Sequence, residues 1–178
     1  VVIIEPKEID AAVFSTAFNL NKLEAQKSAE IISHLKPERA ILDCPSPNLN
    51  GYKSEVEFHL GLVAGTVVGA AAGTVAGVVS TAELAVEIIP RHKADVDFPV
   101  VSAASIIAKV TRDAIIEELK ELHGEDFGSG YLSDPKTTIF LEEHWNTPAF
   151  ATLFRKSWEP WKRISYSQGQ MNLANFNR

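Results

Sequence analysis

The stretch LAVEIIPRHKADVDFPVVSAASIIAKVTRD, residues 84–113, decides the fold class that we expect for this chain. Its first six residues are mostly apolar and stop at Pro90, which predicts a buried strand. A charged loop, RHKAD, follows, and Ser102 is expected to cap a long helix. The apolar stripe of that helix is Ala103, Ile107, Val110 and Ala114, continuing towards Leu122.

Further strands and helices alternate with this unit on both sides. Residues 1–4 (VVII) and 40–42 (AIL) predict two more short strands. Between them a helix is expected over 22–35, with Asn21 as N-cap and Lys36-Pro37 as its end. The remaining helices are expected over 51–60, 135–145 and 148–164, and the end of the chain, 167–178, reads as a loose tail. This alternation predicts an α/β fold with parallel strand pairing.

The composition is that of an ordinary globular domain. The chain has 178 residues, 46% of them hydrophobic, and a formal net charge of −6. This charge argues against a protein covered by nucleic acid, but it leaves room for a local basic groove. The one cysteine, Cys44, excludes a disulfide framework and a multi-cysteine zinc site, and we expect it to be a small buried residue.

Two aspartates follow predicted strands. Asp43 comes after the strand at 40–42, and Asp95 comes after the strand at 84–89. If those strands are neighbours, the two carboxylates converge at one edge of the sheet, where open α/β sheets bind ligands. Carboxylates without His or Cys partners suit Mg²⁺ or Mn²⁺. The alternative is that both aspartates cap helices or turns.

Basic and hydroxyl residues gather in sequence around the start of the long helix. Ser102 and Ser105 offer hydroxyls at the expected helix N-terminus, which would suit a phosphate group. The cations near them are His92, Lys93, Lys109 and Arg112. The alternative is an ordinary solvated helix with one capping serine.

A second basic segment, RKSWEPWKR at 155–163, interleaves four cations with two indole rings. Such interleaving suits contacts with a nucleic-acid backbone and stacking on bases. An amphipathic helix that buries Trp158 and Trp161 in the core fits the same residues.

Two long blocks, HKADVDFPVVSAASIIAKVTRD at 92–113 and FGSGYLSDPKT at 127–137, resemble the archaeal-type ribonuclease HII family. Weaker agreement covers EPKEID, NLNKLEA, ILDCPSPN and RKSWEPWKR. The resemblance implies a ribonuclease H-like sheet with flanking helices and a helical C-terminal extension, over residues 1–166. It also implies hydrolysis of RNA in RNA–DNA hybrids, and at ribonucleotides embedded in DNA, with roles in DNA replication and repair.

The resemblance carries individual residues. Asp43 and Asp95 match expected metal ligands for Mg²⁺ or Mn²⁺ in a two-metal mechanism. Tyr131 in GSGY matches a tyrosine that packs against the deoxyribose next to the ribonucleotide. The residues that would contact phosphates are Ser102, Ser105, Lys109, Lys93 and Arg112. We also expect a monomer in the cytoplasm, with no small-molecule cofactor and no membrane association.

The chain departs from the family pattern in one respect. The family's first strand carries a DEAGRG motif with further metal-binding carboxylates, and nothing in this chain matches it. We therefore expect the family's first two strands to be missing, and Val1–Ile4 to take the vacant place beside 40–43. With two aspartates only, we expect little or no activity. A hybrid-binding fragment without catalysis is the nearest alternative.

The glycine repeat GLVAGTVVGAAAGTVAGVVS at 61–80 has no counterpart in the family. Glycine recurs at every fourth position from Gly61 to Gly77, and no charge occurs from Leu60 to Ala82. A low-complexity insertion over 61–82, a packed hairpin or helix, and a glycine-zipper membrane or self-association element all fit the repeat. An insertion is expected to be tolerated if the strands on either side still pair.

Overall fold

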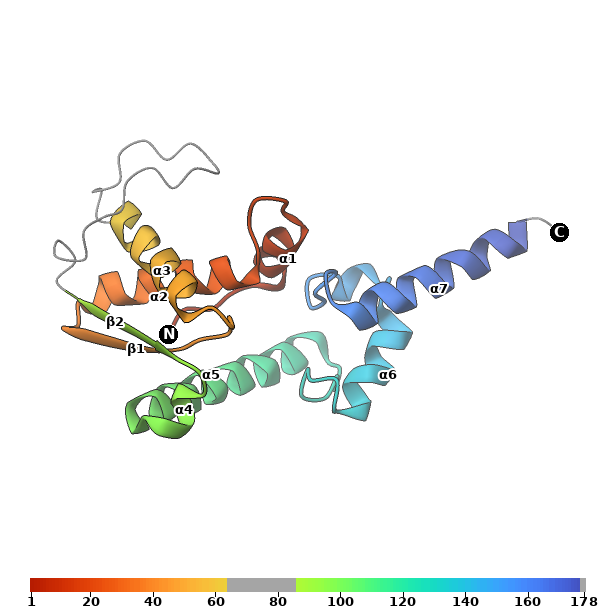
Figure 1. Ribbon diagram of the computed structural model, residues 1–178. Helices are drawn as coiled ribbons and strands as arrows, with labels where there is room; N and C mark the ends of the chain where they lie inside the picture. Colours follow the sequence, from red (N-terminus) through yellow and green to blue (C-terminus); the bar gives the residue numbers. More distant parts are fainter. Residues whose placement is uncertain (64–85, 177–178) are drawn as a thin grey trace. The chain divides into compact units, whose positions relative to one another are not determined.

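The computed structural model describes residues 1–63 and 86–176, and it divides into two compact units (Figure 1). Unit 1 comprises Val1–Ile3 and Ser15–Ala108. Unit 2 comprises Ile4–Phe14 and Lys109–Arg178.

Unit 1 is built on two parallel strands, β1 (Arg39–Asp43) and β2 (Glu87–Arg91). The register pairs Arg39 with Glu87 and Asp43 with Arg91, and the Arg39 and Glu87 side chains form an exposed ion pair at 2.7 Å. The expected parallel pairing of these two strands is thus confirmed. The carboxyl ends of both strands lie at the same edge of the sheet.

Strand β2 includes Pro90, which we expected to end it. The backbone carbonyl of Arg91 accepts a hydrogen bond from the N–H of Cys44, so Arg91 faces β1. Because successive residues of a strand point their backbone groups to opposite sides, Pro90 faces the other edge of β2. No described strand pairs with that edge, so the missing N–H of Pro90 costs no ladder hydrogen bond.

Two helices, α2 (Leu20–Leu35) and α3 (Leu49–Val63), pack against each other and against the sheet (Figure 1). Cys44 is buried among their side chains, as expected. The hydroxyls of Ser28 and Tyr52 lie 3.4 Å apart across the two helices. The buried core of unit 1 consists of Ala25, Ala29, Ile32, Ala40, Cys44, Tyr52, Val56, Leu60 and Ile88.

The start of unit 1 differs from the sequence-based expectation. Val1–Ile4 forms no strand, and Val1 and Ile3 are exposed, so the expected pairing of this segment beside 40–43 is wrong. The N-cap of α2 is Asn19 rather than Asn21, because the Asn19 side chain accepts a hydrogen bond from the N–H of Lys22. The helix ends as predicted, at Lys36 in the left-handed conformation.

After β2 the expected charged loop contains a short helix, α4 (Ala94–Asp97), and α5 (Pro99–His123) begins directly behind it. Helix α5 therefore starts at Pro99, and Ser102 lies inside its first turn instead of capping it. The N–H of Ser102 donates to the carbonyl of Phe98. Proline suits the first helical position because it has no N–H to satisfy there.

The apolar stripe of α5 is not buried. Ile107 is 56% exposed, Val110 62% and Leu122 77%, and α5 has no buried residue. The long helix and its apolar stripe are present as expected, but the side chains of the stripe are exposed. An amphipathic sequence pattern thus gives the helix but not the burial of its apolar face.

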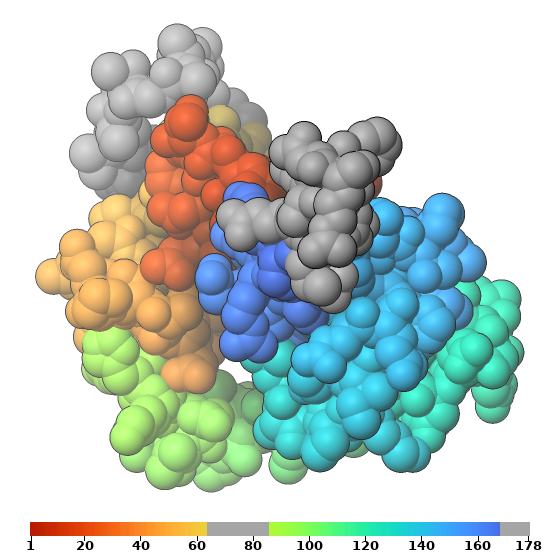
Figure 2. All heavy atoms as spheres, turned by 90° about the vertical axis from the view of Figure 1, so that its right-hand side faces the viewer, coloured from red at the N-terminus to blue at the C-terminus, as the bar shows by residue number. Residues whose placement is uncertain are grey.

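Unit 2 contains α1 (Pro6–Phe14), α6 (Pro135–His144), the 3₁₀ turn η1 (Pro148–Phe150) and α7 (Glu159–Phe176), besides most of α5. Figure 2 shows the atoms of α6 and of the segment after it, cyan to light blue, as one closely packed surface. The core is aromatic, with Phe127, Phe140 and Phe150 in mutual contact.

The helix expected over 148–164 is replaced by η1, a run of turns, and α7 from Glu159. Pro148 is the first residue of η1, and Pro160 is the second residue of α7. Because proline favours the start of a helix, two separate helical segments form here. Helix α7 extends to Phe176, so residues 167–176 of the expected tail are helical in backbone.

Most of the glycine repeat lies outside the described residues. The same holds for the expected insertion over 61–82 after Val63, and for the first two residues of the strand predicted at 84–89. The first three residues of the repeat, 61–63, are the last of α3. In the part of the chain that the structure describes, no helix has both the length and the apolar character needed to cross a bilayer.

Candidate nuclease site

The carboxylate of Asp43 is held at the end of β1 by a contact with the segment after β2. Its Oδ1 accepts a hydrogen bond at 3.0 Å from the backbone N–H of Ala94. Lys93, the residue before α4, has φ of 55° and makes no side-chain cap of its own. Asp43 therefore caps α4 from the neighbouring strand, with its negative charge at the positive end of the helix.

This contact brings Asp95 to the same sheet edge, because Asp95 directly follows Ala94 in α4. Both aspartates are exposed at this edge. Asp43 thus has the capping role that the sequence left open as an alternative. That role uses Oδ1, and no residue that the structure describes hydrogen-bonds Oδ2.

Two carboxylates at one edge fit a single Mg²⁺ or Mn²⁺ ion, because Mg²⁺ is commonly held by one or two carboxylates together with water and substrate phosphates. They do not fit a pair of ions. Among the described residues, no group of three or more His, Cys, Asp or Glu side chains could hold a metal.

The residues of the expected phosphate cradle do not all lie at the N-terminus of α5. Ser102 and Ser105 lie within α5, where helical hydrogen bonds use the backbone N–H groups. Lys109 and Arg112 lie more than two turns beyond Pro99 and belong to unit 2. Lys93 and His92 are exposed beside Asp43 and Ala94 in unit 1.

In unit 2 the glycine-rich turn between α5 and α6 is held by side chains of the following helix. Asp134, the N-cap of α6, accepts from the N–H of Lys136 at 3.0 Å and from the N–H of Ser129 at 2.7 Å. Hydrogen bonds from Ser129 lower the pKa of Asp134. Thr137, which is buried, donates to the carbonyl of Phe127 and accepts from the N–H of Gly130 at 2.9 Å.

A charged residue on the other side of the turn adds to this bracing. Asp126 accepts from the N–H of Gly128 at 3.1 Å and contacts Lys136 Nζ at 2.5 Å. The hydrogen bond from Lys136 lowers the pKa of Asp126 to about 2. The turn is thus fixed at Gly128, Ser129 and Gly130 by three separate side chains, and Tyr131 follows directly.

Two cationic side chains lie near the ring of Tyr131. The Arg112 guanidinium carbon lies 3.9 Å from the centroid of the Tyr131 ring, and Lys109 Nζ lies 6.0 Å from it. Asp113 accepts from Lys109 at 2.6 Å and from Arg112 at 3.2 Å. The hydrogen bond between Lys109 and Asp113 raises the pKa of Lys109 and lowers that of Asp113.

A hollow of about 640 Å³ lies beside these side chains, with walls from α5, the turn and the start of α6. Its lining mixes both signs of charge with the Tyr131 ring. The lining residues are Lys109, Asp113, Ile116, Glu117, Lys120, Asp126, Gly128, Ser129, Tyr131, Asp134, Pro135 and Lys136.

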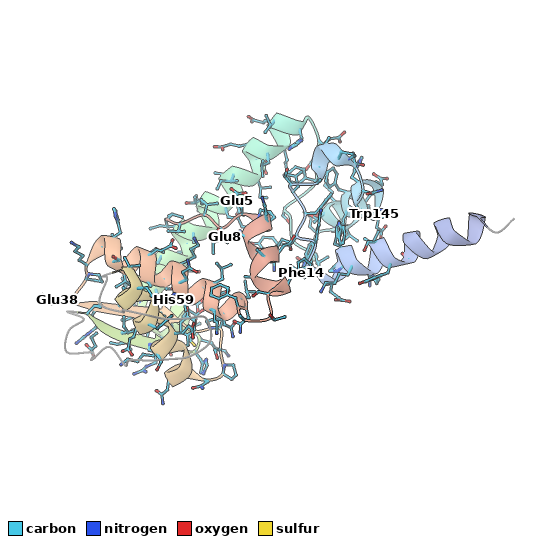
Figure 3. All side chains as sticks on the ribbon, turned by 90° about the horizontal axis from the view of Figure 1, so that it is seen from above. Glu5, Glu8, Phe14, Glu38, His59 and Trp145 are labelled. Atoms are coloured by element: carbon cyan, nitrogen blue, oxygen red, sulfur yellow. The ribbon has the colours of Figure 1, made fainter. Side chains whose placement is uncertain are left out.

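The tryptophans of RKSWEPWKR are used for packing within unit 2. Trp161 Nε1 donates to the carbonyl of Trp145 at 3.3 Å, and the two indole rings meet edge to face with centroids 6.2 Å apart. Figure 3 labels Trp145, whose side chain lies among those of unit 2. Trp158 is half-buried. The packing alternative for this segment is therefore favoured over base stacking.

Comparison with known proteins decides the family. The model of the family described as ribonuclease HII matches residues 2–160. The chain belongs to the ribonuclease HII family. Ribonuclease HII of Pyrococcus furiosus is 37% identical over 183 residues, which covers 99% of this chain and 70% of the relative. Members of this family cleave the RNA of RNA–DNA hybrids.

Solved structures agree with this assignment and with the expected fold. The ribonuclease H2 from Pyrococcus horikoshii OT3 is 34% identical with a TM-score of 0.66, over 93% of this chain and 67% of that one. The ribonuclease HII in a complex with PCNA from Archaeoglobus fulgidus is 33% identical with a TM-score of 0.63, over 92% of this chain and 65% of that one. The chain thus spans about two thirds of the length of these neighbours.

Five residues of the candidate site were not predicted from the sequence: Asp113, Asp126, Asp134, Lys136 and Thr137. The pair Asp134-Pro135 is a recognisable helix start, so the capping role of Asp134 could have been predicted. Lys109 and Asp113 are four residues apart, which is the spacing of an ion pair on a helix. The role of Thr137 could not be predicted from the sequence, because it depends on how α6 packs against the turn.

Proposed function

We propose that this chain recognises RNA–DNA hybrids, and DNA with embedded ribonucleotides, and that it contributes metal-binding carboxylates for their hydrolysis. The family match over residues 2–160 is the observation that carries this proposal. The contact of Asp43 with Ala94 supports the metal site, since it brings Asp95 beside Asp43.

In this proposal Asp43 and Asp95 hold one Mg²⁺ or Mn²⁺ ion through their free oxygens. The ion, when bound, would act as a Lewis acid on the scissile phosphate. Tyr131 would pack against the sugar beside the ribonucleotide, where the 2′-hydroxyl distinguishes RNA from DNA. Lys93 lies beside the carboxylates and would balance the charge of a phosphate. Ser102, Ser105 and Lys109 remain proposed phosphate contacts.

Hydrolysis by this chain alone is expected to be slow or absent. Two carboxylates supply too few protein oxygens for the pair of ions that a two-metal mechanism uses. A duplex with a single embedded ribonucleotide, incubated with the chain in Mg²⁺ or Mn²⁺, tests this directly. Robust cleavage that Asp43→Asn abolishes would contradict the expectation of low activity.

Binding tests the substrate class separately. In EDTA, where no hydrolysis occurs, the chain should bind an RNA–DNA hybrid more tightly than a DNA duplex of the same sequence in a fluorescence anisotropy titration. Equal affinity for the two duplexes would overturn the proposed substrate.

A further inference from the structure

Arg112 was expected to contact a phosphate, but its guanidinium is already engaged. Its carbon lies 3.9 Å from the centroid of the Tyr131 ring, well inside the range of cation–π contacts. The Tyr131 residue is 45% exposed, so part of its surface remains open to a ligand. A guanidinium is planar and can stack on an aromatic face, whereas a lysine ammonium cannot.

The positive charge of Arg112 is also partly compensated by Asp113. Asp113 Oδ1 lies 3.2 Å from Arg112 Nη1, and Asp113 Oδ2 lies 2.6 Å from Lys109 Nζ. The two cations thus share one carboxylate, and the three side chains together keep one net positive charge. A guanidinium whose charge is partly compensated and which lies over an aromatic ring is better suited to holding Tyr131 than to binding a phosphate.

The turn leaves space for this arrangement at Gly130. A Cβ added there would lie 2.8 Å from Arg112 Nη2, and Gly130 has φ of +74°. The N–H of Gly130 is fixed by Thr137 Oγ1. The backbone next to Tyr131 is therefore held by α6, and the ring of Tyr131 is held by α5.

We propose that Arg112 is a positioning residue, which stacks on Tyr131 and fixes the orientation of its ring for contact with the sugar at a DNA–RNA junction. This inference rests on the proposed function. It assigns the selectivity for an embedded ribonucleotide to the pair of Arg112 and Tyr131 together, and not to Tyr131 alone.

The first test observes the ring without any substrate. The chain has three tyrosines, at 52, 131 and 166, so 3-fluorotyrosine labelling gives three ¹⁹F resonances, and Tyr131→Phe assigns one of them. Arg112→Gln and Arg112→Lys should each shift the Tyr131 resonance and leave the other two in place. An unchanged Tyr131 resonance in both variants would overturn the stacking.

The second test measures binding in EDTA to two duplexes, one all-DNA and one with a single ribonucleotide. Arg112→Lys and Arg112→Gln should both lower the preference for the ribonucleotide about two- to fivefold, the range that a partly exposed cation–π contact supports. Arg39→Gln removes a guanidinium elsewhere, and it should leave the preference unchanged.

A phosphate contact would give a different pattern. Arg112→Lys would then retain affinity, and Arg112→Gln would weaken binding to both duplexes equally with a salt slope smaller by about one. That outcome would overturn the inference. A wild-type chain with no preference between the duplexes would refute the proposed function and the role at the junction, whereas the ¹⁹F shift would still decide whether Arg112 holds Tyr131.

Discussion

Asp43 Oδ1 accepts a hydrogen bond from the N–H of Ala94 at 3.0 Å, across the carboxyl ends of β1 and β2. One side chain thereby both caps α4 and fixes the position of Asp95. The glycine repeat separates these two segments in sequence, yet their strands pair in parallel register. The proposed metal site therefore depends on a contact between segments far apart in the chain.

Asp43→Asn should separate capping from metal binding. An asparagine side chain keeps an oxygen that can accept from Ala94, so stability should change little, whereas Asp43→Ala should cost about 1 kcal/mol of unfolding free energy. Titration calorimetry with Mn²⁺ should show weaker binding in both variants. Asp97→Asn, in the same short helix, is the matched control, and equal Mn²⁺ affinity in all four proteins would refute the site.

Gly128→Ala should destabilise the turn more than Gly124→Ala does. Both glycines have positive φ, +72° and +67°. The backbone strain of an alanine should therefore lower the free energy of unfolding by a similar amount at each, about 1–2 kcal/mol. At Gly128 the new Cβ would also lie 2.6 Å from Asp134 Oδ2, while at Gly124 nothing lies within 4 Å. Urea unfolding of the two variants isolates the contact, and equal losses would contradict the bracing of the turn by Asp134.

His59 should make the stability of unit 1 depend on pH. It is buried on α3, with its ring edge to face against Phe18 and Phe58, and Figure 3 shows it among the side chains of unit 1. Burial lowers the pKa of His59, although Glu55 Oε1, 3.5 Å from Nε2, acts to raise it.

A lowered folded-state pKa means that the unfolded chain binds the proton more readily. The contribution of His59 is therefore intact above the unfolded pKa of 6.5 and declines as the pH falls below it. Urea unfolding at pH 7.5 and 5.5 should show this loss in the wild type and less of it in His59→Leu. His34→Leu, at an exposed histidine of α2, should keep the wild-type pH dependence; a His59→Leu variant that also keeps it would exclude His59 as the cause.

Asp10 should stabilise unit 2 through two backbone hydrogen bonds. Its carboxylate oxygens accept from the N–H groups of Lys156 and Ser157, each at 2.8 Å, and so connect α1 to the segment before α7. Asp10→Ala should cost about 1–3 kcal/mol, since it leaves these donors without their charged acceptor. Lys7→Ala, at an exposed charged residue of the same helix, is the matched control for a lost surface charge.

The pH dependence of this contact has a defined sign. Partial burial acts to raise the pKa of Asp10, but the hydrogen bonds from Ser157 and Lys156 outweigh it, and the net pKa is lowered. The stabilisation is present above the unfolded carboxyl pKa near 4 and is lost as the pH falls through the lower folded value. The difference in unfolding free energy between wild type and Asp10→Ala should therefore shrink in acid; a constant difference would contradict the assignment.

The exposed apolar stripe of α5 should tolerate polar substitutions. Ile107→Gln should change the unfolding free energy by no more than about 0.5 kcal/mol, as at a surface position, because Ile107 is 56% exposed. A buried isoleucine would cost several times as much. A loss above about 2 kcal/mol would show that this face is covered in solution.

The sequence by itself determined the local elements and the family. Apolar runs ending in Asp43 and near Pro90 predicted β1 and β2, and the long blocks around Asp95 and Tyr131 carried the resemblance that the comparisons confirm. These signals are local, since they depend on backbone propensity and on residues close together in the chain.

Only the tertiary structure decided what those residues contact. Val1–Ile4 has strand-forming residues but forms no strand, and the α5 stripe has helical periodicity but its residues are exposed. Asn19 and Asn21 are the same residue type, and the helix start that the packing of α2 allows selects Asn19. Asp43 caps α4, and Arg112 stacks on Tyr131, because folding brings distant segments together, and no spacing along the chain encodes such contacts.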